Sequence, residues 1–470
     1  MTDDFEIMGS WWLPENENKK IPGLLKFAAE KEIELELMSS FDESQEQFFK
    51  RKQPLYFDII LGESRGRKLT LLRSQEKHKE GGSVGDSTFW RSSFHCDYII
   101  EGIHFLSLDG IKFARMSVNF TYLEDWISPN PFVHEDMDGM DVIRYVNPPS
   151  HDIKIERINS VISIVSSESY SSDFKTVSMS VHSAFIIKPI AESKVIGWYE
   201  DVIGCLGNFL TLAIGKPTYP RSVTAYLSNR HEIEIFFSIS NMLHMKDIHF
   251  SQMMIPYKDL TSYLDKFMNN WFNYSDTLEP VYELFFGTYY AQLYPRFYFL
   301  SLIQTIEAFH RRIYGDKGEY LSKDDYEPLR NDLTRSIPTE FPDDRDYPTG
   351  FRDALKSKIK FGNEYSLRTR LNQLSNIWGP LDSLLYENTV EFNHGIVCTR
   401  NYLTHYEKAP GCPIFEGRAL NSINIILNSL CLIVLITHMG IPKLDAFRIV
   451  RRHNGRSLTN AINEIFQELI

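Results

Sequence analysis

The first half of the chain carries short apolar runs that are separated by clusters of Gly, Ser and Asp. These runs are rich in β-branched and aromatic residues, which is typical of strands. Several such runs without helical patterns between them predict a β-sandwich or an open barrel. We expect loops at the polar, glycine-rich segment Glu76–Ser87 and at the acidic segment His134–Asp141. The predicted strands are Glu34–Met38, Tyr56–Leu61, Lys68–Leu72, Tyr98–Leu108, Met116–Thr121 and Ile153–Val165.

One helix is predicted within this β-rich half. Apolar residues recur at near-helical spacing over Val195–Ile214, and Gly215 followed by Pro217 is a typical stop signal. The segment His231–Ile239 then alternates between polar and apolar residues, which predicts another strand.

The pattern changes to helices near residue 280. Val281–Tyr314 predicts a long helix with a break or kink at Pro295, and the charged segment Asp324–Arg352 predicts a surface loop or short helices. The sequence therefore predicts an α+β protein, with a β-rich domain over residues 1–280 and an all-α bundle over residues 281–470. The other predicted helices are Arg368–Tyr386, Thr389–Tyr406, Arg418–His438 and Leu458–Leu469.

Charge is distributed unevenly between the two predicted domains. The 470 residues are 43% hydrophobic, which excludes wholesale disorder, and their net charge of −12 argues against a globally basic nucleic-acid binder. Residues 281–470 hold 22 basic and 22 acidic residues, and the remaining 28 basic and 40 acidic residues leave −12 for residues 1–280. The global charge therefore does not argue against a nucleic-acid site in the helical domain. The helical domain has a basic run near the C-terminus, which is either a solvated face or a phosphate contact. This run consists of Lys443, Arg448, Arg451, Arg452, His453 and Arg456.

Cysteine usage and hydropathy limit the class of protein further. The five cysteines are scattered and include no C-x-x-C pair, so we expect neither a disulfide framework nor a zinc ribbon. The N-terminal residues contain no apolar signal-peptide core. In Leu420–Met439 the longest uninterrupted apolar run is only Leu430–Ile436, which favours a buried core helix because a membrane span needs about 20 apolar residues. We expect a cytoplasmic protein without a metal, a cofactor or a membrane partner.

The segment Thr399–Tyr406, with the sequence TRNYLTHY, contains the most informative polar residues of the chain. On a helix that advances about 100° per residue, Asn401 and His405 lie within about 40° of each other, and the long side chain of Arg400 reaches toward them. Histidine exchanges protons near neutral pH, and a guanidinium stabilises charge on a phosphate. The combination suits phosphodiester cleavage without a metal, in which His405 acts as acid or base and Asn401 orients a partner.

Two readings of this segment stay open on the residues alone. An arginine and a histidine at this spacing are common by chance, so a set of surface ion pairs is the simpler reading. RNA cleavage needs both an acid and a base, whereas the segment supplies one histidine. A symmetric dimer that pairs two such helices would supply both, so the chemistry predicts dimerisation.

The same segment resembles the R-x4–6-H motif of the HEPN superfamily, including the polar residue after the arginine. Leu300–Gly315 resembles an upstream HEPN helix, with Glu307, His310 and Arg311 in the matching pattern. Segments of the N-terminal half resemble ApeA-type proteins, which are bacterial anti-phage HEPN proteins that act by abortive infection. These segments are Gly9–Pro14, Ile21–Phe27, the ILG and KLTLL stretches, and Ala213–Pro220.

The resemblance implies a metal-independent endoribonuclease with Arg400 and His405 as catalytic residues and Asn401 and Glu307 in support. It also implies a composite site at a homodimer or higher homo-oligomer formed through the HEPN domain. The expected partners are an RNA substrate, with tRNA as one candidate, and a phage-derived trigger acting on the N-terminal domain. We expect RNA contacts from Arg311, Arg448, Arg451 and Arg452. The alternative is a non-catalytic HEPN protein that mediates interactions or binds nucleotides.

Overall fold

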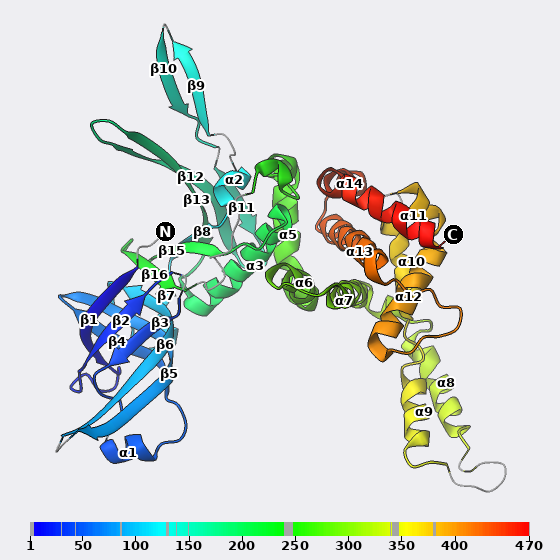
Figure 1. Cartoon of the computed structure of the whole chain (residues 1–470), viewed down its shortest axis with the longest axis horizontal. Coiled ribbons are helices and arrows are strands. Elements are labelled where there is room, and N and C mark those ends of the chain that lie inside the picture. The colour runs from blue at the N-terminus through cyan, green and yellow to red at the C-terminus, as the bar shows by residue number, and fades with distance from the viewer. Residues whose placement is uncertain are drawn as a thin grey trace. The chain divides into compact units, whose positions relative to one another are not determined.

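The computed structural model divides into two compact units, Met1–Phe272 and Asn273–Ile470 (Figure 1). It describes residues 4–469 apart from 30, 43, 85–86, 128–130, 138, 149, 239–247, 339, 341–346 and 379–381. The division lies a few residues before the expected boundary at 280, which falls inside the helix α6 (Ser275–Tyr290). A β-rich unit followed by a helical unit confirms the predicted α+β class.

A closed six-stranded antiparallel barrel forms the first part of unit 1. Strand β6 pairs with both β3 and β5, so the order β6-β3-β2-β1-β4-β5 returns to β6 and leaves no free edge. Alternate residues point inward and form an apolar core around Trp11, Leu25 and Phe94, which are fully buried. The strands are β1 (Phe5–Trp12), β2 (Ile21–Phe27), β3 (Ile33–Leu37), β4 (Tyr56–Ser64), β5 (Arg67–Val84) and β6 (Ser87–Glu101).

An open antiparallel sheet continues from the barrel, because β16 also pairs with β6 through Ile235 and Ile100. Its order is β16-β15-β8-β13-β12-β11, which places β11 at the edge of the sheet. The strands are β8 (Arg115–Phe120), β11 (His151–Ile155), β12 (Ser160–Ser172), β13 (Val177–Pro189), β15 (Pro220–Tyr226) and β16 (Glu232–Phe237). Two small ribbons pair β7 (Lys112–Phe113) with β14 (Lys194–Val195) and β9 (Phe132–Met137) with β10 (Met140–Tyr145).

Helices of unit 1 pack on this sheet and on its edge. The predicted helix is confirmed as α3 (Ile196–Ile214), which ends at Gly215 in the left-handed conformation. Its Phe209 contacts the rings of Trp126 and Trp271. The side chain of Asn269 donates to Lys154 O in β11 and accepts from the N–H of Glu156, the residue after this strand. The other short helices are α1 (Gln45–Lys50), α2 (Leu123–Ile127), α4 (Tyr257–Leu260) and α5 (Leu264–Asn273).

Two expected loops are strands instead. Residues 76–84 belong to β5 and pair with β6 as an extended hairpin, and the acidic segment forms the β9–β10 hairpin around Gly139. Asp138 of that segment lies outside the described residues. Both predictions were wrong because an exposed ribbon satisfies its backbone hydrogen bonds across the pair and needs no apolar face. The run Ile153–Val165 is likewise two strands, β11 and β12, joined by a turn that contains Asn159 at φ +46°.

Unit 2 is helical, as predicted. The break at Pro295 is confirmed, since proline is the first residue of α7, and Arg368–Tyr386 is two helices instead of one. The basic run from Lys443 is helical throughout, so the last helix starts well before Leu458. The helices after α6 are α7 (Pro295–Tyr314), α8 (Lys323–Arg335), α9 (Phe351–Lys360), α10 (Leu367–Trp378), α11 (Ser383–Glu387), α12 (Thr389–His405), α13 (Gly417–His438) and α14 (Lys443–Leu469).

The helix α13 is the central core element of unit 2. It packs against α7 and α14, and it is the one helix in the described part of the chain that is long and apolar enough to cross a membrane. Because 83% of its most apolar window is buried inside the unit, the prediction of a core helix is confirmed.

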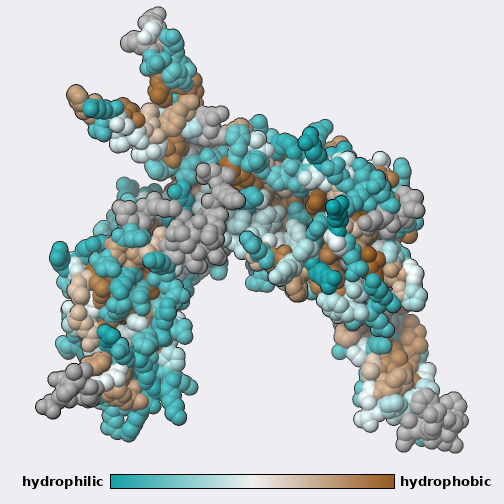
Figure 2. Space-filling model, viewed as in Figure 1, coloured by the Kyte–Doolittle hydropathy of each residue, from teal (hydrophilic) through white to brown (hydrophobic). Residues whose placement is uncertain are grey.

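The helices α8 and α9 are the least buried part of unit 2. Neither helix has a buried residue among those described. Leu329 and Leu333 of α8 and Phe351 of α9 are each more than 40% exposed, and Figure 2 shows apolar side chains gathered over this hairpin.

Candidate functional site

The helix α12 is held firmly on its apolar side. Phe392, Ile396 and Leu403 are buried, and Asn393 donates a hydrogen bond to Asn372 Oδ1 on α10 at 2.8 Å. A Cβ atom at Gly395 would lie 2.7 Å from the ring of Phe415, so only glycine permits this close approach. These contacts fix the position of the polar side chains on the opposite side of the helix.

The predicted motif residues occupy the last turns of α12 and face solvent. Arg400 is half-buried and its Nη1 donates to Asn401 Oδ1 at 3.2 Å, whereas Asn401 and His405 are exposed. Thr404 donates to the backbone oxygen of Arg400 at 2.7 Å, which occupies its hydroxyl proton. The helix ends after His405, because Tyr406 adopts the left-handed conformation at φ +55°. An arginine, an amide and an imidazole are therefore available together at one helix end.

An apolar cleft of about 510 Å³ lies beside the motif. Leu403 and Tyr406, which flank His405 in the sequence, line one side, and Tyr294 and Phe297 at the start of α7 line the other. Tyr294, Phe297 and Tyr406 are 78%, 60% and 66% exposed, so the rim of the cleft presents aromatic surface to solvent. The remaining lining residues are Pro295, Arg296, Leu300, Gly417 and Leu420.

Glu307, which we expected in a supporting role, is part of an ion-pair chain on α7. Arg311 Nη2 donates to Glu307 at 3.2 Å and Arg311 Nη1 donates to Glu364 at 2.6 Å. Partial burial acts to lower the pKa of Arg311, but the hydrogen bonds and charges of Glu364 and Glu307 together outweigh it, so the pKa of Arg311 is raised. The RNA contact expected of Arg311 stays a prediction, and a phosphate would have to compete with Glu364 for the guanidinium.

A second arginine and histidine meet inside unit 2, between α7 and α10. His310 is fully buried, accepts a hydrogen bond from Arg370 Nη1 at 3.0 Å on Nδ1, and donates from Nε2 to Gln373 Oε1 at 2.6 Å. Burial lowers the pKa of His310, and burial likewise lowers the pKa of Arg370. Both ring nitrogens are occupied, so this pair is a packing element and is not accessible to a substrate.

The predicted basic run forms an exposed face of α14. Arg448, Arg452 and Arg456 are spaced four residues apart and point to the same side of the helix. Arg448 pairs with Asp445 at 2.9 Å and Arg451 with Asp382 at 3.5 Å, and both arginine side chains are more than half exposed. Such exposed pairs are weak, which leaves the guanidinium groups able to bind phosphate.

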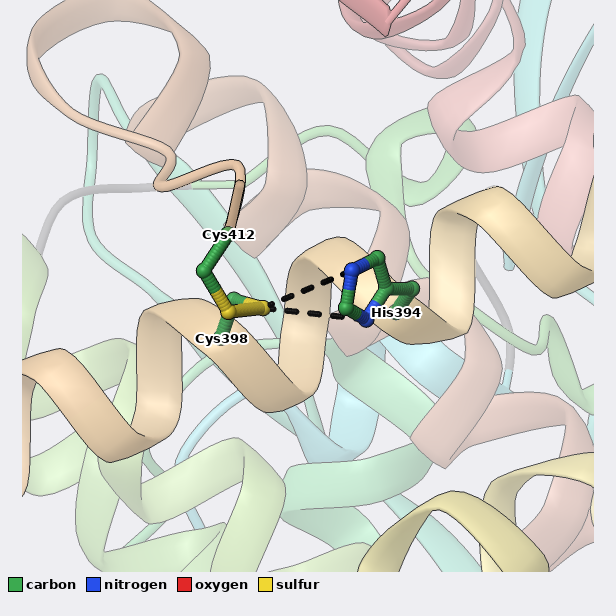
Figure 3. A group of neighbouring side chains, drawn as sticks. All are labelled: His394, Cys398 and Cys412. Carbon is green, nitrogen blue, oxygen red and sulfur yellow. Dashed lines mark hydrogen bonds between the residues drawn. A yellow bond between two sulfur atoms is a disulfide. The ribbon is translucent and has the colours of Figure 1, made fainter. Parts of the chain in front are cut away.

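Cys398 and Cys412 form a single disulfide, which the scattered cysteine positions did not indicate. His394 lies one turn before Cys398 on α12, and Figure 3 shows its ring facing the disulfide. Donor atoms of the three residues lie within 4.8 Å of one another, so the same side chains are close enough to share a metal ion if both sulfurs are reduced. The sequence offered one signal for this cluster, the four-residue spacing of His394 and Cys398. The loop that returns Cys412 to the helix gave none.

Comparison with known protein families decides the identity of both units. Residues 6–271 match ApeA N-terminal domain 1, which covers more than half of the chain, and residues 300–444 match Apea-like HEPN. The chain is an ApeA-type HEPN protein. No curated protein and no solved structure matches it.

Membership in the ApeA-type HEPN family supports an anti-phage role of the HEPN nuclease type. The HEPN match includes Arg400, Asn401, His405 and the whole ion-pair chain of Glu307. It ends at residue 444, so the basic face of α14 lies beyond it. The family assignment was thus predictable from the motif and from short N-terminal segments. The buried pair of His310 and Arg370 and the disulfide were not predicted.

Proposed function

We propose that this ApeA-type protein is a metal-independent endoribonuclease of a bacterial abortive-infection defence, acting in the cytoplasm. One observation carries the proposal: Arg400, Asn401 and His405 lie together and open to solvent at the end of a helix that is anchored on its other side. Exposed polar groups on a rigid element are the arrangement expected of a catalytic site, since the groups keep their geometry while a substrate enters.

The chemistry is attack of a ribose 2′-OH on the adjacent phosphorus, which leaves a cyclic phosphate and a 5′-OH end. One imidazole removes the 2′-OH proton while another protonates the leaving 5′ oxygen. The guanidinium of Arg400 stabilises the charge that builds on the non-bridging oxygens. Asn401, which already accepts a hydrogen bond from Arg400, orients that guanidinium.

Because one chain supplies one motif histidine, the active species is a homodimer or a higher oligomer. The apolar cleft lined by Leu403 and Tyr406 supports pairing through this end of the HEPN unit, because a second copy would cover exposed aromatic rings next to His405. The exposed face of α14 is the proposed RNA contact, and unit 1 is the proposed sensor of a phage-derived trigger.

The direct test is cleavage of total RNA and of tRNA by the purified full chain in EDTA. We expect cleavage with 2′,3′-cyclic phosphate ends, and a loss of about 10²–10⁴-fold in His405→Ala, the range for removing a general acid or base. Thr389→Ala, at the other end of α12, is the matched control and should cleave normally. Retained cleavage in His405→Ala would exclude the mechanism, and a complete absence of cleavage by the wild type would favour the non-catalytic alternative.

A mixing experiment tests the composite site. A ninefold excess of co-folded His405→Ala chains places about nine in ten wild-type chains in mixed dimers, so the activity per wild-type chain should fall about tenfold. An unchanged activity per wild-type chain, with total activity falling only with the fraction of wild-type chains, would show that each chain works alone.

A further inference from the structure

The disulfide between Cys398 and Cys412 encloses the whole motif. It joins residues 14 apart in the sequence, and Arg400, Asn401 and His405 all lie between them. The RNA-cleavage mechanism uses neither sulfur. The proposed mechanism therefore gives no role to the cluster of His394, Cys398 and Cys412.

The cluster lies on the same flank of α12 as the motif histidine. His394, Cys398, Asn401 and His405 occupy positions i, i+4, i+7 and i+11 of one continuous helix, and their directions agree within about 60°. Cys398 is therefore about two turns from His405 on a shared side of the helix. A structural change at the sulfur acts directly beside the proposed active site.

The loop after His405 returns along this flank. The Nζ atom of Lys408 lies 5.4 Å from the centre of the Tyr402 ring, and Cys412 reaches back to Cys398. Residues 407–411 are exposed and adopt no helix or strand. The disulfide is thus the covalent restraint that holds an exposed segment against the side of α12 that carries Asn401 and His405.

The helix itself is anchored without the disulfide. Phe415 closes the loop independently, because its N–H donates to Thr399 Oγ1 at 2.9 Å and its ring packs on Gly395. Breaking the sulfur bond would release residues 407–411 and leave α12 in place. The bond therefore affects access to the motif more than the position of the motif.

The surroundings of Cys398 suit reversible exchange. Cys398 is 3% exposed, whereas Cys412 is half-buried, so an incoming thiolate attacks the sulfur of Cys412 and Cys398 leaves. Arg368 Nη2 donates to Nδ1 of His394 at 2.5 Å, which places the ring proton on Nε2. The sulfur of Cys398 lies 3.7 Å from Nδ1 and 3.8 Å from Nε2 of His394, so this ring and the Arg368 guanidinium bonded to it lie beside the sulfur that departs as a thiolate.

We propose that Cys398 and Cys412 are a reversible thiol–disulfide switch that restrains RNA cleavage when oxidised. Oxidation by a peroxide converts two thiols and one peroxide molecule into the disulfide and two waters. Reduction by a dithiol transfers two electrons and two protons, which regenerates both thiols and leaves the reductant as a disulfide. The control of RNA cleavage by this switch rests on the proposed function. The reduced form, expected under cytoplasmic conditions, is the active one.

The experiment compares the full chain after dithiothreitol and after hydrogen peroxide, with each excess reagent removed. Alkylation and peptide mass spectrometry report the state of Cys398 and Cys412, hydrogen exchange reports residues 407–411, and the RNA assay reports activity. We expect faster exchange in 407–411 on reduction and cleavage that is faster by about fivefold or more, the lower end of typical regulatory coupling. Cys412→Ser and Cys412→Ala should match the reduced wild type under both treatments. Cys205→Ser, which leaves the pair intact, should remain redox-sensitive.

The outcomes separate this proposal from the proposed function. Equal cleavage and equal exchange in both verified redox states would overturn the switch while the ribonuclease assignment stands. If the wild type cleaves no RNA in either state, the ribonuclease assignment fails, and exchange in 407–411 still decides whether the sulfur bond controls the loop. One zinc ion per reduced chain that is lost in Cys412→Ser would also overturn the switch, since the three side chains would then be a metal site.

Discussion

Two of the arginine and histidine pairs described in unit 2 lie in opposite environments. His310 and Arg370 are buried between α7 and α10, and both ring nitrogens of His310 have partners. Arg400 and His405 lie at the end of α12, where Arg400 is bonded only to its neighbour Asn401 among its described side-chain contacts and His405 is exposed. The same residue types thus stabilise the fold in one place and remain available for chemistry in the other. Solvent access and unfilled hydrogen-bonding capacity separate the two roles.

The sharpest test of this comparison truncates one arginine from each pair. Arg400→Ala should reduce RNA cleavage by about 10³-fold, as expected for loss of a group that stabilises transition-state charge. The free energy of unfolding should change by less than about 0.5 kcal/mol, because the side chain has one surface partner. RNA cleavage and thermal unfolding of the same preparations provide the two readouts.

Arg370→Ala should give the reverse pattern. It leaves His310 Nδ1 and the backbone oxygen of Tyr365 without their donor, at a cost of about 3 kcal/mol, or a fall in Tm of about 6–12 °C for unit 2. Activity measured well below the Tm should persist. Arg335→Ala on the exposed helix α8 is the control for both. A cleavage defect in folded Arg370→Ala would remove the distinction between the pairs.

A second test asks whether exposed arginines outside the motif contact RNA. The triple variant Arg448→Gln, Arg451→Gln and Arg452→Gln should weaken binding of single-stranded RNA about tenfold near physiological salt. It should also flatten the slope of log K against log salt by about 2, since each phosphate contact contributes about 0.7. Binding is measured in the His405→Ala background to prevent cleavage.

The matched triple variant Arg335→Gln, Lys356→Gln and Lys358→Gln removes the same charge from the α8–α9 hairpin. Its salt dependence should equal that of the parent chain. Equal losses in both triple variants would mean that charge acts at long range, without a specific basic face.

The smallest expected effect is a loss of stability in acid. Burial lowers the pKa of His310 and of His438, so both rings bind a proton less readily in the folded unit than in the unfolded chain. As the pH falls through the unfolded value near 6.5, the unfolded chain takes up protons that the folded chain does not, and stability decreases. His438→Phe keeps a ring against Tyr274 and Phe309 and should reduce the fall in Tm between pH 7.5 and 5.5 by about 2 °C. An unchanged pH profile would contradict the burial argument.

Much of the helical unit was predictable because its elements have strong local signals. Pro295 marks the start of α7, and the motif appears on α12 with Asn401 beside Arg400, as spacing suggested. The sequence misled where the deciding contacts join distant residues. His310 has no local sign of burial, since Arg370 and Gln373 meet it from a helix about 60 residues later. The hairpin of β5 and β6 was missed because its polar outer part is stabilised by pairing rather than by a core.

The edge strand β11 has a consequence for how the chain matures. In the described part of the large sheet, the closed barrel leaves β11 as an edge with unpaired backbone groups, which is where sheets of different molecules join and aggregate. From a helix more than 100 residues downstream, Asn269 bonds Lys154 O of this strand and the N–H of Glu156 directly after it. During translation, β11 is therefore synthesised, and its edge is open to pairing, long before Asn269 is synthesised. Aggregation during translation is thus a hazard specific to unit 1, and chains truncated before α5 should be the most prone to it.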